Sequence, residues 1–521
     1  MRERLFALLF RYRWPLLAAA FAHGLVVHLL FVGFASWDGF AYRVPPIVEL
    51  VQHGSFGFEK YNQWAFNGYL PFIELLHTPF IAVFKQAGTI LAFPIVAFPL
   101  CVYAIFLLGR ELTGDARGGA FSALAYAAIP AHNQQPYSGH IDFVVIPLIA
   151  FLTYAIIRAA KEPTRKSFLR IVVAMVILSL SRTTAVYLVG FFYPVLALPL
   201  FFTRDGFRPR LVKKKELVLA TLAIACGSLP SLGIQVWKLF HYGSPIYPYQ
   251  FQFFGVKVGS GVSTKDLFFY AGLADETPAA YWASFRSGWL WPSLWPPGLF
   301  SDSRHFGGGF VLHVALLLVP TFWRKATALE KWLVVGGVLV SFLARDYWLP
   351  RWAYTFTVAI TIVIGRALAH LSREKGRRLL FAVATGVLAL HLARPEFDMY
   401  MTRHSIGPRM NVAGSPWFLD GPDQQDTFPD VHARFVIVYF VWNGFILPLY
   451  GRRMTNEVLF SVPEDGLGPD CANLRAIAKR EPDVLFIDDS QLTKHCAREC
   501  GMEVPPGNCR AWRMLEPDSK P

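Results

Sequence analysis

Apolar stretches long enough to cross a lipid bilayer recur along this chain of 521 residues. A membrane span needs roughly 20 apolar residues, and the sequence contains about eleven such stretches when it is scanned for hydropathy. They lie near residues 14–35, 88–108, 118–131, 143–160, 170–181, 183–202, 217–235, 306–323, 332–349, 352–370 and 379–393. Only 17% of the residues are charged, which is fewer than a soluble protein of this length carries. The sequence therefore predicts an α-helical polytopic membrane protein with about eleven transmembrane helices.

The formal net charge of +14 would also suit a nucleic-acid-binding protein, but the positions of the basic residues favour a membrane topology. Six short loops on alternate sides of the predicted spans carry 24 lysine and arginine residues. The intervening loop 131–142 has none, and the loop 36–88 has three. This alternation follows the positive-inside rule and places the N-terminus in the cytoplasm. We therefore expect a multi-pass membrane protein with no nucleic-acid partner. The sequence contains no Asn-x-Ser/Thr sequon, which fits a protein of the bacterial inner (plasma) membrane.

Three hydrophilic regions lie outside the cytoplasm in this topology: the loops 36–88 and 236–305, and the tail 394–521. Within the first loop, residues 68–84 are apolar but would reverse the charge alternation as a span. They are expected to form an amphipathic helix at the outer interface. The aromatic residues of 236–305 suit the headgroup layer.

We therefore divide the chain into two predicted domains. The transmembrane domain covers residues 1–393 and includes the outer loops 36–88, 131–142 and 236–305. The C-terminal domain covers 394–521 and is periplasmic.

The tail has the pattern of a small extracytoplasmic α/β domain. Strand-like runs at 434–442 and 483–488 flank the helix-like sequence CANLRAIAKR. The apolar segment 435–450 could also be a short span, but its strand-forming residues favour a strand followed by a turn. Four cysteines occur in the tail, and in the periplasm disulfides are favoured over a zinc knuckle; they are Cys471, Cys496, Cys500 and Cys509.

Acidic residues follow the first predicted span and lie in the next outer loop. Asp38 comes directly after span 14–35, and the loop sequence AHNQQPYSGHID supplies His140 and Asp142. Ionisable groups at the edge of a membrane are costly and often functional. Together the two carboxylates suggest a general base, and Asp142 with His140 leaves open a divalent metal site. His132, at the start of the loop, is interpreted as an ordinary loop residue.

These features resemble the GT-C glycosyltransferases, a superfamily that includes the protein O-mannosyltransferases and the bacterial aminoarabinose transferase that modifies lipid A. The resemblance consists of an Asp after the first span, a long first outer loop, an acid in the second outer loop and several weak motifs. The motifs are GFEKYNQWAFNGYLPF (57–72), which lacks a double proline, GRELTGDARGGAFSALAYAAIP (109–130), SLSRTTAVYLV (179–189) and YGSPIYP (242–248).

The resemblance implies inverting sugar transfer from a polyprenyl-phosphate-linked donor to an extracytoplasmic lipid, glycan or protein acceptor. Asp38 would act as the base, and Asp142 with His140 would hold the acceptor or a divalent cation. The departing phosphate needs positive charge, for which the candidates are Lys60, Arg182, Arg345 and Arg351. Arg182 could instead pair with a carboxylate between helices, and Arg345 and Arg351 could belong to an interfacial belt.

Three other function classes stay open at this point. A transporter or flippase of lipid-linked glycan would show internal repeats and charges at the membrane midplane, which this sequence does not show. A polysaccharide polymerase or ligase would use a large late outer loop, and 236–305 keeps this class open. A non-catalytic scaffold for envelope assembly would tolerate replacement of the acidic residues.

Overall fold

The computed structural model describes the chain in segments separated by gaps. These segments are 44–57, 72–84, 92–133, 135–138, 142–181, 214–247, 249–253, 256–260, 262–263, 277–290, 307–344, 353–406, 432–439, 450, 455–461, 471–481, 483–488, 502–503 and 511–514. The chain forms two compact units. The larger unit comprises residues 1–26 and 94–402, and the smaller comprises 27–93 and 403–521.

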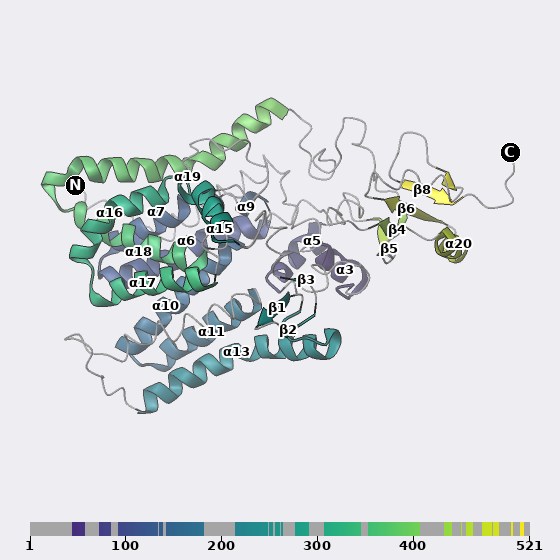
Figure 1. Cartoon of the computed structure of the whole chain (residues 1–521), viewed down its shortest axis with the longest axis horizontal. Helices are drawn as coiled ribbons and strands as arrows, with labels where there is room; N and C mark the ends of the chain where they lie inside the picture. The colour runs from purple at the N-terminus through teal and green to yellow at the C-terminus, as the bar shows by residue number, and fades with distance from the viewer. Residues whose placement is uncertain are drawn as a thin grey trace. The chain divides into compact units, whose positions relative to one another are not determined.

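The larger unit is built from helices, drawn from blue to green in Figure 1. They are α6 (Ala92–Thr113), α7 (Ala116–Ala127), α10 (Val145–Lys161), α11 (Arg165–Ser181), α13 (Lys214–Tyr242), α16 (Val311–Lys325), α17 (Ala328–Ala344), α18 (Tyr354–Leu371) and α19 (Arg378–Ile406). Each coincides with one predicted span, while the predicted spans 14–35 and 183–202 lie outside the described residues. By length and composition, four helices within the described segments can cross a membrane: Val96–Thr113, Asp142–Lys161, Leu222–Tyr242 and Tyr354–Leu371.

Helices α13 and α19 run furthest past the predicted ends of their spans. Helix α13 continues to Tyr242, seven residues beyond 235, and ends where Gly243 adopts a left-handed φ of 68°. Glycine is the usual residue at such a helix end because it has no Cβ to clash. Helix α19 continues to Ile406. Hydropathy marks where a helix leaves an apolar environment, whereas the helix itself can continue into a polar one.

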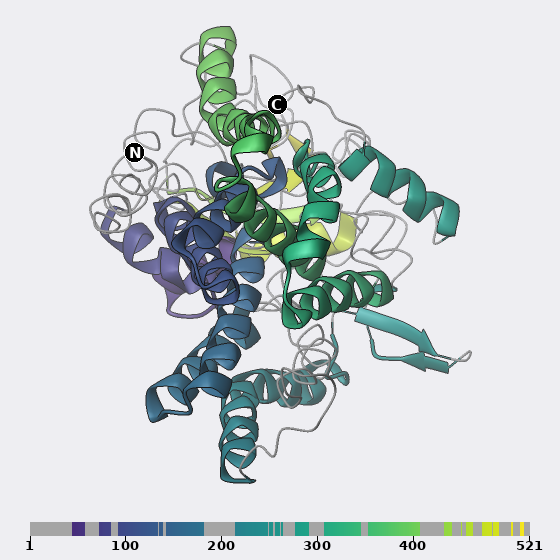
Figure 2. The same cartoon turned by 90° about the vertical axis from the view of Figure 1, so that its left-hand side faces the viewer.

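Helix α18 lies at the centre of the larger unit. It packs against α7, α10, α16 and α17, and 89% of its membrane-spanning stretch is buried within the protein. The two views in Figures 1 and 2 also show α11 and α13 running side by side, in agreement with their packing.

Small residues allow α18 to approach its neighbours closely. The Ser122 hydroxyl on α7 donates to the Thr361 carbonyl at 3.0 Å. A Cβ at either Gly109 of α6 or Gly365 of α18 would collide with the Ser122 side chain. Small residues at such contacts are typical of helix packing in membranes, where backbones must come close to gain dispersion energy.

Short elements connect the helices. On the predicted outer side between α7 and α10 these are α8 (Pro130–Asn133), α9 (Gln135–Ser138) and the 3₁₀ helix η4 (Asp142–Val144). The segment after α13 forms β1 (Tyr249–Phe253), β2 (Val256–Val258) and β3 (Val262–Ser263), followed by α15 (Pro278–Phe285) and the π-helix η6 (Arg286–Leu290).

The smaller unit combines parts of the first outer loop with the tail. From the loop come α3 (Pro45–His53), the 3₁₀ helix η2 (Glu74–His77) and α5 (Thr78–Phe84). The structure thus has helical turns over residues 74–84, within the predicted interfacial helix. The sequence-based division counted this loop with the transmembrane part of the chain, whereas here the loop groups with residues 403–521.

Among the residues described from 432 to 514, the tail forms a five-stranded sheet and one helix. Its elements are β4 (Arg434–Tyr439), β5 (Glu457–Ser461), α20 (Cys471–Arg480), β6 (Val484–Asp488), β7 (Met502–Glu503) and β8 (Ala511–Met514). The strand order is β5-β4-β6-β8-β7, with β4 parallel to both β5 and β6. Phe435, Val436, Val458 and Val484 are buried.

Strands β4 and β6 lie within the predicted strand-like runs 434–442 and 483–488, and α20 matches the predicted helix between them. Residues 440–449 lie outside the described segments, so the turn predicted after the strand stays a prediction. Cys496, Cys500 and Cys509 also lie outside them, and the disulfide prediction stays a prediction.

Candidate functional site

Asp142 occupies a rigid, buried position at the start of η4, directly before α10. Its side chain is fully buried. The amide nitrogen of the next residue, Phe143, donates to Gln135 Oε1 at 2.6 Å, and the Phe143 carbonyl accepts from Tyr126 Oη at 2.5 Å. Gln135 Nε2 in turn donates to the Ala131 carbonyl at 2.6 Å. These bonds fix the backbone beside Asp142 to α7, α8 and α9.

His132 lies beside this carboxylate and is also fully buried. Its ring stacks on Tyr126, with 5.3 Å between the ring centroids and 14° between the ring planes. Burial lowers the pKa of His132 to about 3, although the Asp142 carboxylate opposes this shift. The imidazole is therefore neutral near pH 7. The interpretation of His132 as a loop residue was wrong, because it belongs to α8 and packs into the interior.

Further hydrogen bonds join the residues around Asp142 and His132 to α19 and to the start of α16. Asn133 Nδ2 donates to the His391 carbonyl at 3.0 Å, and His391 Nε2 accepts from the Phe310 amide at 3.2 Å. The Ala131 amide donates to the Gly307 carbonyl at 3.3 Å. The predicted outer ends of α7, α16 and α19 thus meet around residues 130–133, 135–138 and 142–144, which we call the outer cluster. It contains a carboxylate and a neutral imidazole that can accept or donate hydrogen bonds.

The buried neutral state of His132 predicts a pH dependence of stability. Since its pKa is about 3 when folded and about 6.5 when unfolded, the unfolded state binds more protons between these values. The contribution of His132 to the free energy of unfolding is therefore largest above about pH 6.5. It decreases as the pH drops and is smaller by about 2 kcal/mol at pH 5. His132→Phe keeps an aromatic ring on Tyr126 but cannot titrate, so its thermal unfolding in detergent should change less between pH 7 and pH 5. His241→Phe, at an exposed position, controls for the loss of a histidine; an unchanged pH profile in His132→Phe would contradict the assignment.

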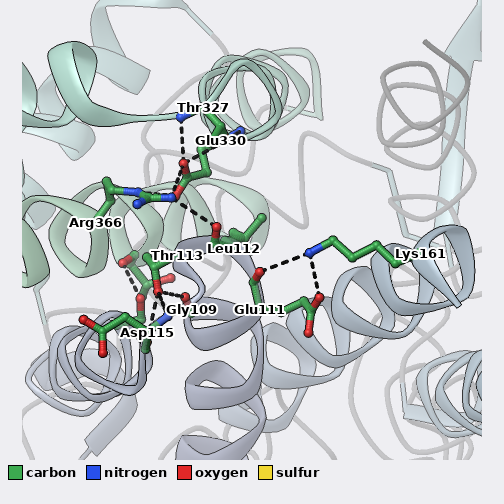
Figure 3. Close-up of polar contacts among 11 residues, drawn as sticks. Gly109, Glu111, Leu112, Thr113, Asp115, Lys161, Thr327, Glu330 and Arg366 are labelled. Carbon is green, nitrogen blue, oxygen red and sulfur yellow. Dashed lines mark hydrogen bonds and ion pairs between the residues drawn. The ribbon is translucent and has the colours of Figure 1, made fainter. Parts of the chain in front are cut away.

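A second polar cluster, which we call the inner cluster, joins α6, α17 and α18 at ends that were predicted to face the cytoplasm (Figure 3). Arg366 of α18 makes two bonds of 2.7 Å to the carboxylate of Glu330, one from Nε and one from Nη2. Arg366 Nη2 also donates to the Leu112 carbonyl near the end of α6, at 3.1 Å. Glu330 is fully buried and accepts from the Thr327 amide and hydroxyl at 2.8 and 2.9 Å. The Glu330 amide donates back to Thr327 Oγ1 at 3.3 Å, which makes this helix start a capping box.

Further ion pairs extend this inner cluster over neighbouring helix ends. Lys161 at the end of α10 contacts Glu111 at 2.8 Å, and Arg373 after α18 contacts Asp115 at 2.5 Å. Asp115 is also the N-cap of α7, because its side chain accepts from the Arg117 amide. The segments that carry these residues were all predicted to lie on the cytoplasmic side, and the structure brings them together. The inner cluster joins helices to one another and supplies no candidate for the sugar-transfer site.

Most of the predicted site residues fall outside the described segments. They are Asp38, Lys60, His140, Arg182, Arg345 and Arg351, and Asp142 is the predicted residue that the structure places. Among the described residues, no three His, Cys, Asp or Glu side chains are grouped so that they could hold a metal ion. The described donors alone do not fit a metal site, and the predicted pair of Asp142 and His140 stays a prediction.

Sequence reasoning missed several members of the two clusters. Gln135 and Asn133 belong to the polar run AHNQQPYSGHID, and that run was the available signal for them. His391 could have been noticed as a histidine within an otherwise apolar predicted span. Arg366 and Glu330 are 36 residues apart, and their pairing depends on how two helices pack.

Comparisons with known proteins found a match to a sequence family and a similarity of fold to solved structures. Residues 71–232 match the family of dolichyl-phosphate-mannose-protein mannosyltransferases. The fold is similar to the crystal structure of ArnT from Cupriavidus metallidurans bound to undecaprenyl phosphate, with a TM-score of 0.56, and to that of the apo state, with a TM-score of 0.58. Each alignment covers 96% of this chain and 97% of ArnT, at 13% identity. The predicted resemblance to the GT-C glycosyltransferases is confirmed.

The stretch that matches the mannosyltransferase family includes α6, α7, α10 and α11, and it therefore contains Asp142 and the surrounding part of the outer cluster. The structural similarity to ArnT is much more extensive and covers both compact units. No sequence among the curated proteins matches this chain.

Proposed function

We propose that this protein is a glycosyltransferase that moves a sugar from a polyprenyl-phosphate-linked donor to an acceptor on the outer face of the bacterial inner membrane. The observation that carries the proposal is the similarity of fold to ArnT over 96% of the chain, since one of the similar structures contains undecaprenyl phosphate. The match of residues 71–232 to a mannosyltransferase family supports the same class of reaction.

In the proposed reaction, Asp38 takes the proton from the attacking group of the acceptor. The acceptor atom then forms a bond to the anomeric carbon as the bond from that carbon to the phosphate oxygen breaks, and polyprenyl phosphate leaves with the bonding electrons. A carboxylate is suited to this role because a base within hydrogen-bond reach of the acceptor lowers the barrier to attack. Lys60, Arg182, Arg345 and Arg351 are the proposed partners of the phosphate, whose negative charge grows as it departs.

Asp142 is proposed to orient the acceptor, together with His140. The structure favours a positioning role for Asp142 because the backbone beside it is fixed by three buried hydrogen bonds. Such rigidity is what a group that aligns two reactants requires, since loss of alignment by about 1 Å can cost 100-fold in rate. No step of the proposed reaction is assigned to a metal ion.

The experiment that tests this function uses the full-length protein in proteoliposomes with a polyprenyl-phosphate donor whose sugar is radiolabelled. A glycosyltransferase releases the label from the lipid into a water-soluble or acceptor-linked product, and the unlabelled polyprenyl phosphate accumulates. A flippase moves the intact labelled lipid to the opposite leaflet and leaves its sugar–phosphate bond unbroken. Detection of movement without bond cleavage, over a panel of lipid, glycan and peptide acceptors, would replace the present proposal with transport.

A further inference from the structure

Helix α3 from the first outer loop is held by the tail through one buried and one partly buried hydrogen bond. Glu49 on α3 is 1% exposed, and its Oε1 accepts a short hydrogen bond from the hydroxyl of Tyr450, which is fully buried. On the next turn of α3, Gln52 Nε2 donates to the carbonyl of Asn456 at 3.1 Å. These contacts join residues that are more than 400 positions apart in the sequence.

The tail residues that make these contacts are themselves fixed to the sheet. Asn456 is 1% exposed and accepts from the Ala433 amide at 3.1 Å through its Oδ1, directly before strand β4. The Asn456 amide donates to the Tyr450 carbonyl at 3.1 Å. A movement of α3 relative to β4 would therefore break a connected set of hydrogen bonds, of which the bond between Tyr450 and Glu49 is buried and those made by Asn456 with Gln52 and Ala433 are partly buried.

Because Glu49 is buried, its carboxyl group depends on hydrogen bonds such as the one from Tyr450. A buried carboxylate without a hydrogen-bond donor is strongly unfavourable, and hydrogen bonds to charged groups are stronger than those between neutral groups. Ile47 and Val48 of α3 are fully buried, so the same helix also contributes apolar contacts. Beyond its C-terminal end, Gly57 has a φ of 65° and leaves little room between its backbone and the Glu49 side chain.

The placement of α3 matters because of what precedes it in the sequence. Asp38, the proposed base, lies seven residues before Pro45, the first residue of α3. An extended chain spans at most about 3.6 Å per residue, so a fixed α3 limits Asp38 to a region within roughly 25 Å of Pro45.

We propose that the tail is a positioning element for the first outer loop, in which Tyr450 and Asn456 hold α3 and thereby limit where the segment that contains Asp38 can lie. This inference rests on the proposed function for its effect on catalysis. Tyr450 is thus a positioning residue that acts on the reaction through Glu49 and α3.

The test compares Tyr450→Phe with the wild-type full-length protein in two measurements. Tyr450→Phe removes the hydroxyl that donates to Glu49 and keeps the aromatic ring, so hydrogen exchange of the α3 amides should become about 10- to 100-fold faster. In the transfer assay, kcat should fall by about 10-fold or more while the KM for the donor changes less than twofold, because alignment rather than binding is lost.

Two further variants serve as controls for Tyr450→Phe. Glu49→Gln retains an oxygen that accepts from Tyr450 and should keep kcat closer to the wild-type value than Tyr450→Phe does. Glu481→Gln changes a partly exposed carboxylate of the same tail, which pairs with Arg434 at 2.8 Å, and should leave α3 exchange and kcat unchanged. If Tyr450→Phe does not fold, Gln52→Leu removes a second hydrogen bond between α3 and the tail, which Gln52 donates to the Asn456 carbonyl. The α3 exchange rate and the kcat of Gln52→Leu then decide the question.

The inference is overturned if α3 exchange stays at the wild-type rate, or if it accelerates while kcat does not change. A wild-type protein that transfers no sugar would instead reject the proposed function. The exchange measurement would then still report whether the tail holds α3, so the two failures can be told apart.

Discussion

Asp38→Asn is expected to slow sugar transfer by about 10²- to 10⁴-fold, the range typical for removal of a general base. The carboxamide has nearly the same shape as the carboxylate but cannot accept the proton of the attacking acceptor. Because Asn can still hydrogen-bond, binding of the lipid-linked donor should be close to that of the wild type. The measurement is the initial rate of label transfer in proteoliposomes, together with the KM for the donor.

A second outer-loop carboxylate provides the control for this prediction. Asp266→Asn removes one negative charge from the loop 236–305 and should leave the rate of transfer within about twofold of the wild type, because Asp266 has no part in the proposed reaction. In the wild type, kcat/KM should decline at acidic pH as the base becomes protonated, and Asp38→Asn should lose that decline. Transfer at the wild-type rate by Asp38→Asn would remove this residue from the mechanism.

Glu330→Ala is expected to cause the largest loss of stability, about 3–5 kcal/mol, because it leaves the Arg366 guanidinium without its buried partner. Arg366 is 18% exposed and Glu330 is fully buried, so water can replace little of the lost interaction. The substitution also removes the acceptor for the Thr327 amide and hydroxyl at the start of α17. The thermal unfolding temperature in detergent, measured at pH 7 and low salt, should fall clearly.

An exposed ion pair at the C-terminal end of α10 gives a comparison. Glu162 is 61% exposed and pairs with Arg158 at 2.7 Å, one helical turn away. Glu162→Gln should cost less than about 1 kcal/mol, as exposed pairs usually do, although it removes a bond of the same length as that between Glu330 and Arg366. Equal losses of stability in Glu330→Ala and Glu162→Gln would show that burial does not determine how strongly these ion pairs stabilise the protein.

The helices of the larger unit could be predicted from sequence because the information is local. A span such as 352–370 is apolar along most of its length, before Arg366 near its end, and its helix α18 (Tyr354–Leu371) is almost wholly buried. The grouping of the inner loops could also be predicted, since the charge alternation determines which helix ends share a side. The contacts of Lys161 with Glu111 and of Arg373 with Asp115 agree with that grouping.

The contacts that depend on distant segments could not be predicted in this way. His132 has the same flanking residues whether its ring faces solvent or stacks on Tyr126, and only the packing of α7 and α8 decides between them. Likewise, no local pattern connects Glu49 with Tyr450, because their pairing depends on the fold of a unit made from two remote parts of the chain. The lengths of α13 and α19 were underestimated because hydropathy reports the apolar part of a helix alone.

The close approach of α6, α7 and α18 has a consequence for how this sequence can diverge. At Gly109 and Gly365 even one added methyl group would collide with Ser122, so mutational drift at these positions is confined to residues without a side chain unless the backbones separate. Leu316 and Leu317 of α16 have more than half of their side-chain surface exposed, and many apolar residues can replace them. Two descendants of this protein could therefore differ at most lipid-facing positions and still retain the same three-helix junction.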